Sequence, residues 1–146
     1  MTDADPSLVG ATPHGLEPRF AVGIDLVAVD EVQTAVAHFG DRYLRRVFTE
    51  HELACSVADG SVRARNLAAL YAAKEATMKA LGSSDHMPAW RSIEVRQEPN
   101  GRCTLRLGGH AAELARRAGL TGFAVSVSHG RDLATAVVVA LGCSEP

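Results

Sequence analysis

The amino-acid sequence predicts a single α+β domain in which an antiparallel sheet of hairpins is packed on one side by helices. Apolar runs on either side of residues 99–101 and of residues 129–132 are typical of two hairpins, and hairpins join antiparallel strands. Residues 62–81 instead place apolar side chains at helical spacing. With 146 residues, of which 47% are hydrophobic and 22% charged, the chain has the size and composition of one globular domain.

Composition also limits the partners and the compartment. The net charge is −2, so we expect no nucleic-acid partner, and an acidic protein partner would need a local basic patch. No apolar run approaches the length of a membrane span, so we expect no membrane partner. Three scattered cysteines without a Cys-x-x-Cys pair argue against a disulfide framework or a zinc cluster and favour a cytoplasmic location.

Three segments are expected along the chain. Residues 1–18 are acidic and rich in Pro and Gly, without the basic and apolar regions of a signal peptide, and we interpret them as a flexible N-terminal extension. Residues 19–142 form the predicted domain, and residues 143–146 a tail.

The first predicted strand, residues 20–29, is apolar except for Asp25 near its centre. Strand alternation places Asp25 on the same face as Val27 and Val29. A carboxylate there is disfavoured by strand propensity and by desolvation. Asp25 either lies at the strand end, facing solvent or capping the next element, or is held for a hard cation or a basic partner.

Capping signals divide the following residues into helices. Asp30 is a plausible N-cap for a helix that runs to about residue 47, and its last turn carries Arg42, Arg45 and Arg46. These arginines either complement the helix dipole or form a basic patch for an acidic partner. The remaining signals are a Thr49/Glu52 capping box, a stop at Asp59-Gly60, a cap at Ser61 for the helix 62–81, and a C-terminal stop at Gly82.

The second half of the chain alternates strands and turns. We expect a loop at 82–88, a strand at 90–96, a turn at 99–101 whose Asn-Gly pair suits positive φ, and a returning strand at 102–107. A helix at 110–118 ending at Gly119, and strands at 122–128 and 133–141, complete the prediction.

The helix 62–81 carries charge where a core helix should not. On a helical wheel Lys74 lies in the middle of the apolar face, Glu75 lies at its edge, and Lys79 follows one turn later. One interpretation is a Lys74 side chain that extends to solvent beside a Glu75–Lys79 surface pair. The other is a functional site, because a buried charge is costly unless it is paired or bound to a metal.

Several motifs occur in order and together carry a resemblance. They are Gly23-Ile-Asp-Leu26, Phe48-Thr-x-x-Glu52, Ala72-Ala-Lys-Glu-Ala76-x-x-Lys79-Ala-Leu-Gly82, Trp90-x-x-Ile-Glu-Val95 and Val125-Ser-Val-Ser-His129. Over about residues 21–141 the sequence resembles the holo-acyl-carrier-protein synthase type of 4′-phosphopantetheinyl transferase. The Lys-Glu-Ala-x-x-Lys-Ala element and the early Gly-x-Asp are the specific part.

The resemblance implies a Mg²⁺-dependent transfer of phosphopantetheine from coenzyme A to a serine of an acidic acyl carrier protein, leaving 3′,5′-ADP. It implies that Asp25 and Glu75 bind the metal, that Lys79, Gly82 and His129 contact coenzyme A, and that the enzyme is a homotrimer with the site at the subunit interface. It also implies catalytic roles for Glu75 and Lys74. Lys74 would pair with the metal-site carboxylates or assist proton transfer, and the serine proton would leave to a metal-bound water or to Glu75.

Physical chemistry agrees with this assignment. Mg²⁺ prefers oxygen ligands and is commonly held by one or two carboxylates together with substrate phosphates, and catalysis of phosphoryl transfer is mostly positioning and charge neutralisation. His129 remains open to a second interpretation, because a single His in a turn is often structural.

Two positions depart from the family's usual pattern. Glu31 and Leu70 stand where family members often have arginines that help to dock the carrier or to hold coenzyme A. Arg42, Arg45 and Arg46 are candidates to supply replacement charge. The alternatives to an active transferase are a catalytically degenerate member that binds coenzyme A or a carrier protein, and a structural module in which Lys74 and Glu75 form a buried ion pair.

Overall fold

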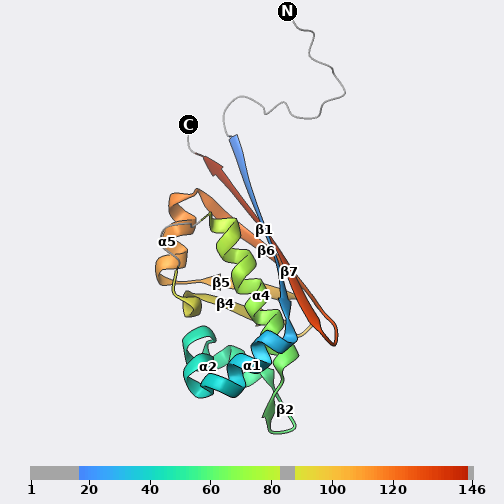
Figure 1. Ribbon diagram of the computed structural model, residues 1–146. Coiled ribbons are helices and arrows are strands. Elements are labelled where there is room, and N and C mark those ends of the chain that lie inside the picture. The colour runs from blue at the N-terminus through green and yellow to red at the C-terminus, as the bar shows by residue number, and fades with distance from the viewer. Residues whose placement is uncertain (1–16, 83–87, 145–146) are drawn as a thin grey trace, which may run out of the picture.

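The computed structural model describes residues 17–82 and 88–144, and within these ranges it shows the predicted α+β architecture. Strands β1 (Glu17–Ala28), β7 (Leu133–Ser144) and β6 (Leu120–His129) form an antiparallel sheet in the order β1-β7-β6. Helix α4 (Ala64–Leu81) lies along one face of this sheet, and the other helices lie on the same side (Figure 1). No helix in the described ranges is long and apolar enough to cross a membrane.

Side chains of strand β1 alternate between the two faces of the sheet, as the sequence predicts. Val27 is buried toward α4, whereas Phe20, Val22, Ile24 and Leu26 on the other face are each at least 60% exposed. Strand β1 begins at Glu17, which pairs with Ser144 of β7, so both strands run past their predicted ends. The predicted division into extension, domain and tail remains a prediction, and residues 1–16 lie outside the described ranges.

The helix predicted for residues 30–47 is in fact two helices. Helix α1 (Val29–Phe39) ends at Gly40, and α2 (Asp41–Val47) starts directly after it. Gly40 has a φ of 55°, which turns the chain and stops the α1 hydrogen-bond pattern. The prediction of Asp30 as N-cap is also wrong, because Ala28 occupies that position and Asp30 lies in the first turn.

The Thr49/Glu52 capping box is confirmed at the start of α3 (Glu50–Ser56). Asp59-Gly60 does not close that helix. It forms the turn between the short strands β2 (Val57–Ala58) and β3 (Ser61–Val62), with positive φ at both turn residues. Ser61 therefore belongs to β3, and α4 begins only at Ala64.

The second half follows the prediction with small shifts. A 3₁₀ turn, η1 (Trp90–Ser92), precedes β4 (Ile93–Gln97), which pairs with β5 (Cys103–Leu107). In the turn between them Gly101 has positive φ, and the Asn100 side chain instead accepts a hydrogen bond from the backbone N–H of Arg102. Helix α5 (Gly109–Arg117) then leads into β6, and residues 83–87 of the predicted loop 82–88 lie outside the described ranges.

Strand β1 and helix α4 approach each other closely at Gly23. A Cβ atom placed on Gly23 would lie 1.8 Å from the backbone oxygen of Ala76, a distance that no side chain tolerates. Glycine at this position lets the strand lie directly against the helix, two residues before Asp25.

We predict that Gly23→Ala destabilises the protein by about 3 kcal/mol, the upper end of the usual range for overpacked sites, because strand and helix backbones must separate. Urea unfolding followed by circular dichroism measures this change. Gly130→Ala is the matched control, because nothing lies within 4 Å of a Cβ there. Equal stability of the two variants would show that the close approach at Gly23 does not matter.

Candidate active site

Asp25 of β1 and Lys79 of α4 form an ion pair at one edge of the strand–helix contact. The Lys79 ammonium donates to the Asp25 carboxylate and to the backbone oxygen of Ile24, each at 3.0 Å. The Asp25 side chain is 14% exposed and that of Lys79 is 54% exposed. An ion pair this close to solvent holds its lysine only weakly, so the ammonium is free to take up another anion.

Glu75 lies on α4 between Tyr71 and Lys79, four residues from each, and is half-buried. The pKa of the Tyr71 hydroxyl is raised above its usual value, first by burial, then by the charge and hydrogen bond of Glu75, and further by the charges of Tyr43 and Asp25. Asp25 contacts Lys79, and Lys79 lies one helical turn after Glu75, so the strand carboxylate approaches α4 close to Glu75.

This region fits a hard divalent cation that takes only part of its ligands from the protein. Within residues 17–82 and 88–144 no group of three or more His, Cys, Asp or Glu is placed to hold a metal ion. Two carboxylates are the number that Mg²⁺ commonly uses when substrate phosphates and water complete its shell. Asp25 and Glu75 are the residues that would hold such an ion, with Lys79 beside them.

Lys74 points away from these carboxylates. It is fully buried and pairs with Glu52 of α3 at 2.7 Å, and it also donates to the backbone oxygens of Trp90, at 3.0 Å, and Ile93. The expectation that Lys74 pairs with the metal-site carboxylates is wrong, and so is the alternative of a buried Lys74–Glu75 pair. Burial lowers the pKa of the Lys74 ammonium, and the charge and hydrogen bond of Glu52 act against that shift.

The sequence predicted Glu52 only as the capping-box partner of Thr49, whereas in the structure it is also the partner of Lys74. Its carboxylate accepts hydrogen bonds from the backbone N–H groups of Thr49, at 2.8 Å, and Val95, at 3.0 Å, in addition to the Lys74 contact. The capping-box motif indicated the Thr49 contact, but it gave no signal for Lys74 or Val95. Removing one partner of a buried pair such as this typically costs about 3–5 kcal/mol.

His129 is not brought together with Asp25 in one chain. It lies at the end of β6, with β7 between it and β1, which puts the two outer strands roughly 10 Å apart at the usual strand spacing. The exposed His129 side chain instead lines a separate hollow of about 280 Å³ with His51, Cys55 and Cys103. Gly82 ends α4 in the left-handed conformation, and its N–H bonds to the Lys79 backbone oxygen.

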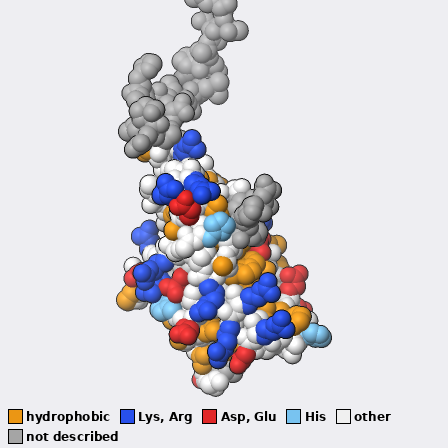
Figure 2. Space-filling view, turned by 90° about the vertical axis from the view of Figure 1, so that its left-hand side faces the viewer, with side chains coloured by type: hydrophobic (Ala, Val, Ile, Leu, Met, Phe, Trp, Pro, Cys, Tyr) orange, Lys and Arg blue, Asp and Glu red, His pale blue; other side chains and the backbone are white. Residues whose placement is uncertain are grey.

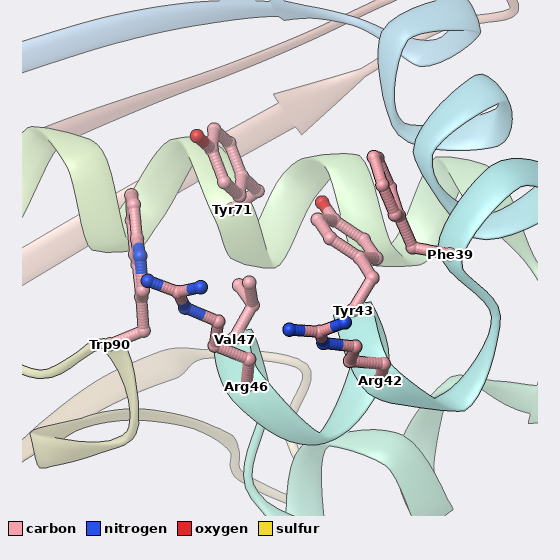
Figure 3. A pocket seen from close by; sticks show the side chains of 7 residues that line it. All are labelled: Phe39, Arg42, Tyr43, Arg46, Val47, Tyr71 and Trp90. Atoms are coloured by element: carbon pink, nitrogen blue, oxygen red, sulfur yellow. The ribbon is translucent and has the colours of Figure 1, made fainter.

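A larger hollow, with a cavity volume of about 420 Å³, opens beside Tyr71. Figure 3 shows Arg42 and Arg46 reaching from α2 toward the aromatic rings around it. Arg45 is exposed but does not line this hollow, so two of the three arginines of the predicted basic group do. The lining residues are Phe39, Arg42, Tyr43, Arg46, Val47, Tyr71 and Trp90. The hollow combines apolar walls with two cations, and Tyr71 in its lining lies one helical turn before Glu75.

Comparison with known proteins identifies the family. Residues 21–138 match the model of the 4′-phosphopantetheinyl transferase superfamily. A holo-[acyl-carrier-protein] synthase from Chloroflexus aurantiacus is 42% identical over 130 residues, covering 81% of this chain and 95% of that protein. One from Herpetosiphon aurantiacus is 42% identical over 128 residues, covering 82% and 97%.

Solved structures agree with the sequence comparison. The ACPS–coenzyme A complex from Chronobacterium ammoniagenes superimposes with a TM-score of 0.72 at 27% identity, covering 88% of this chain and 98% of that chain. The acyl carrier protein synthase of Mycobacterium tuberculosis gives 0.63 at 33% identity, covering 86% and 97%. The chain therefore belongs to the 4′-phosphopantetheinyl transferase superfamily, and within it to the holo-acyl-carrier-protein synthase type.

Proposed function

We propose that this protein transfers 4′-phosphopantetheine from coenzyme A to a serine of an apo acyl carrier protein, leaving 3′,5′-ADP. The observation that carries the proposal is the Asp25–Lys79 contact one helical turn from Glu75, in a chain that is 42% identical to a holo-acyl-carrier-protein synthase. Such a cluster suits a diphosphate, because it offers a cation site and an ammonium side by side.

Asp25 and Glu75 are the proposed ligands of Mg²⁺, which supplies charge neutralisation at the diphosphate when it is bound. Lys79 turns from Asp25 to a coenzyme A phosphate, a movement that its exposure permits. Gly82 and His129 are the further proposed coenzyme A contacts. The carrier serine oxygen attacks the β-phosphorus, the bond from that phosphorus to the bridging oxygen breaks, and 3′,5′-ADP leaves. The serine proton passes to Glu75 or to water.

The hollow beside Tyr71 is the proposed approach for the carrier protein. We expect an acidic carrier protein, and Arg42, Arg45 and Arg46 supply positive charge on α2. Basic side chains gather over the region of α2 on the face in Figure 2. Glu31 on α1 is exposed and cannot supply the charge of the arginine usual at its position. The α2 group therefore serves as the replacement.

We also propose that the protein works as a homotrimer in the cytoplasm. The outer face of the sheet, opposite α4, exposes large apolar side chains in paired positions of β1 and β7: Phe20 with Leu141, Val22 with Val139, and Ile24 with Val137. An apolar face of this extent favours burial against another subunit. Assembly would also let His129 of one subunit serve the carboxylates of another. All three cysteines are free, which suits a reducing compartment.

Incubation with Mg²⁺, coenzyme A and an apo carrier protein, followed by mass spectrometry of the carrier, tests the activity. We predict a mass gain of one phosphopantetheine, its loss on chelation of Mg²⁺, and no gain with Glu75→Ala, because the ion then loses a carboxylate ligand. Glu113→Ala, at a partly exposed carboxylate on α5, is the control that keeps activity. Coenzyme A binding without a mass gain across several carriers would support a degenerate member instead.

Carrier docking has its own test. Reversing Arg42, Arg45 and Arg46 to Glu should lower the transfer rate at low salt by at least about 10-fold through KM for the carrier, because electrostatic steering speeds association by factors of this size or more. Reversing the exposed Arg106, Arg116 and Arg117 to Glu makes the same change in net charge elsewhere and should matter little. An unchanged rate in the α2 variant would remove this group from docking.

The trimer is tested by light scattering in solution. Val22→Lys introduces a charge on the apolar outer face and should reduce the mass to that of a single chain of 15.4 kDa. Val57→Lys, a matched change at an exposed valine of the β2–β3 hairpin, should leave the trimer intact. A parent protein that is already monomeric would contradict the proposal.

A further inference from the structure

Glu52 and Lys74 form a closed polar network in the core. Both side chains are fully buried, and the three N–H groups of the lysine face Glu52, Trp90 and Ile93. The carboxylate completes its own shell with the N–H groups of Thr49 and Val95. The network therefore ties α3, η1 and β4 to a single point in the middle of α4.

One branch of this network leads toward the carboxylate site. The Trp90 backbone oxygen is held by Lys74, and the Trp90 ring stacks on Tyr71 with centroids 4.9 Å apart and an angle of 26° between the planes. Tyr71 in turn lies one helical turn before Glu75 on α4, which makes the two side chains neighbours, and after burial the Glu75 charge is the next cause that raises the pKa of the Tyr71 hydroxyl. A continuous series of contacts thus runs from Glu52 through Lys74, Trp90 and Tyr71 to Glu75.

Lys74 has no free N–H group with which to take part in proton transfer. Its neighbour Glu75 faces the surface, whereas Lys74 faces the core, because adjacent residues of a helix point about 100° apart. A fully satisfied buried ion pair fixes the relative placement of the segments it joins, and groups that orient metal ligands commonly control metal affinity. These observations point to an indirect role.

We infer that Glu52 and Lys74 are positioning residues for the metal site, acting through the Trp90–Tyr71 stack to orient Glu75. Lys74 would then touch neither substrate nor metal. This positioning role replaces the catalytic role that the family resemblance suggested. The inference rests on the proposed function, since it takes Glu75 as a ligand of Mg²⁺.

The test uses the double variant Glu52→Gln/Lys74→Met, which removes both charges together and leaves no unpaired buried ion. Trp90 is the one tryptophan of the chain, so its fluorescence reports on the stack. We expect a folded protein in which acrylamide quenches Trp90 more strongly and in which the Mg²⁺ concentration for half-maximal coenzyme A binding, measured by calorimetry, rises by about 10-fold or more. Arg117→Met, at an exposed ion pair on α5, should change neither quantity.

A second variant tests the positioning role if the double variant does not fold. Trp90→Leu keeps the backbone oxygen that Lys74 holds and removes only the stacked ring of a half-buried residue. It should raise the Mg²⁺ requirement in the same way. A parental Mg²⁺ requirement in Trp90→Leu, or in the folded double variant, would overturn the inference. If the parent protein itself binds coenzyme A without any dependence on Mg²⁺, the proposed metal site fails instead.

Discussion

The contact between β1 and α4 at Gly23 is the constraint on which the site depends. The strand lies so close to the helix that a single methyl group on Gly23 would overlap the Ala76 backbone oxygen. The same approach brings Asp25, two residues along the strand, within hydrogen-bonding distance of Lys79. The apolar residues on the inner face of the sheet pack against α4 on either side of this contact. The fold thus presents a strand carboxylate to a helix that carries its own carboxylate one turn earlier.

Two lysines of α4 differ in role because one is buried and the other is exposed. Lys74 is fully buried, and its donors are taken by Glu52 and two backbone oxygens, so that its charge belongs to the core. Lys79 is about half exposed, and its partner Asp25 is the proposed metal ligand, so that its ammonium is available to a phosphate. A lysine therefore connects segments of the core at position 74 and is available to an anion at position 79, because the surroundings of the two residues differ.

Local signals in the sequence predicted much of this, and tertiary pairing accounts for the features that were missed. The carboxylate in an apolar strand marked Asp25, the Thr49/Glu52 spacing gave the capping box, and Gly82 gave the end of α4, because each depends on near neighbours in the chain. The partner of Lys74 was missed because Glu52 belongs to another helix. The break at Gly40 and the β2–β3 hairpin were missed because a glycine in an apolar periodic run, and strands of two residues, leave little periodic signal. The distance between His129 and Asp25 depends on strand order, which the sequence does not contain.

On the proposed function, Asp25 and Glu75 act together to bind the cation that holds the coenzyme A diphosphate. Calorimetry of coenzyme A binding with and without Mg²⁺, in the parent protein and in Asp25→Asn/Glu75→Gln, tests it most directly. The two substitutions keep the side-chain size and remove both charges. We expect Mg²⁺ to tighten coenzyme A binding by at least about 10-fold in the parent, in line with the effect of metal-site groups on affinity, and to leave it unchanged in the variant. An equal gain from Mg²⁺ in both proteins would contradict it.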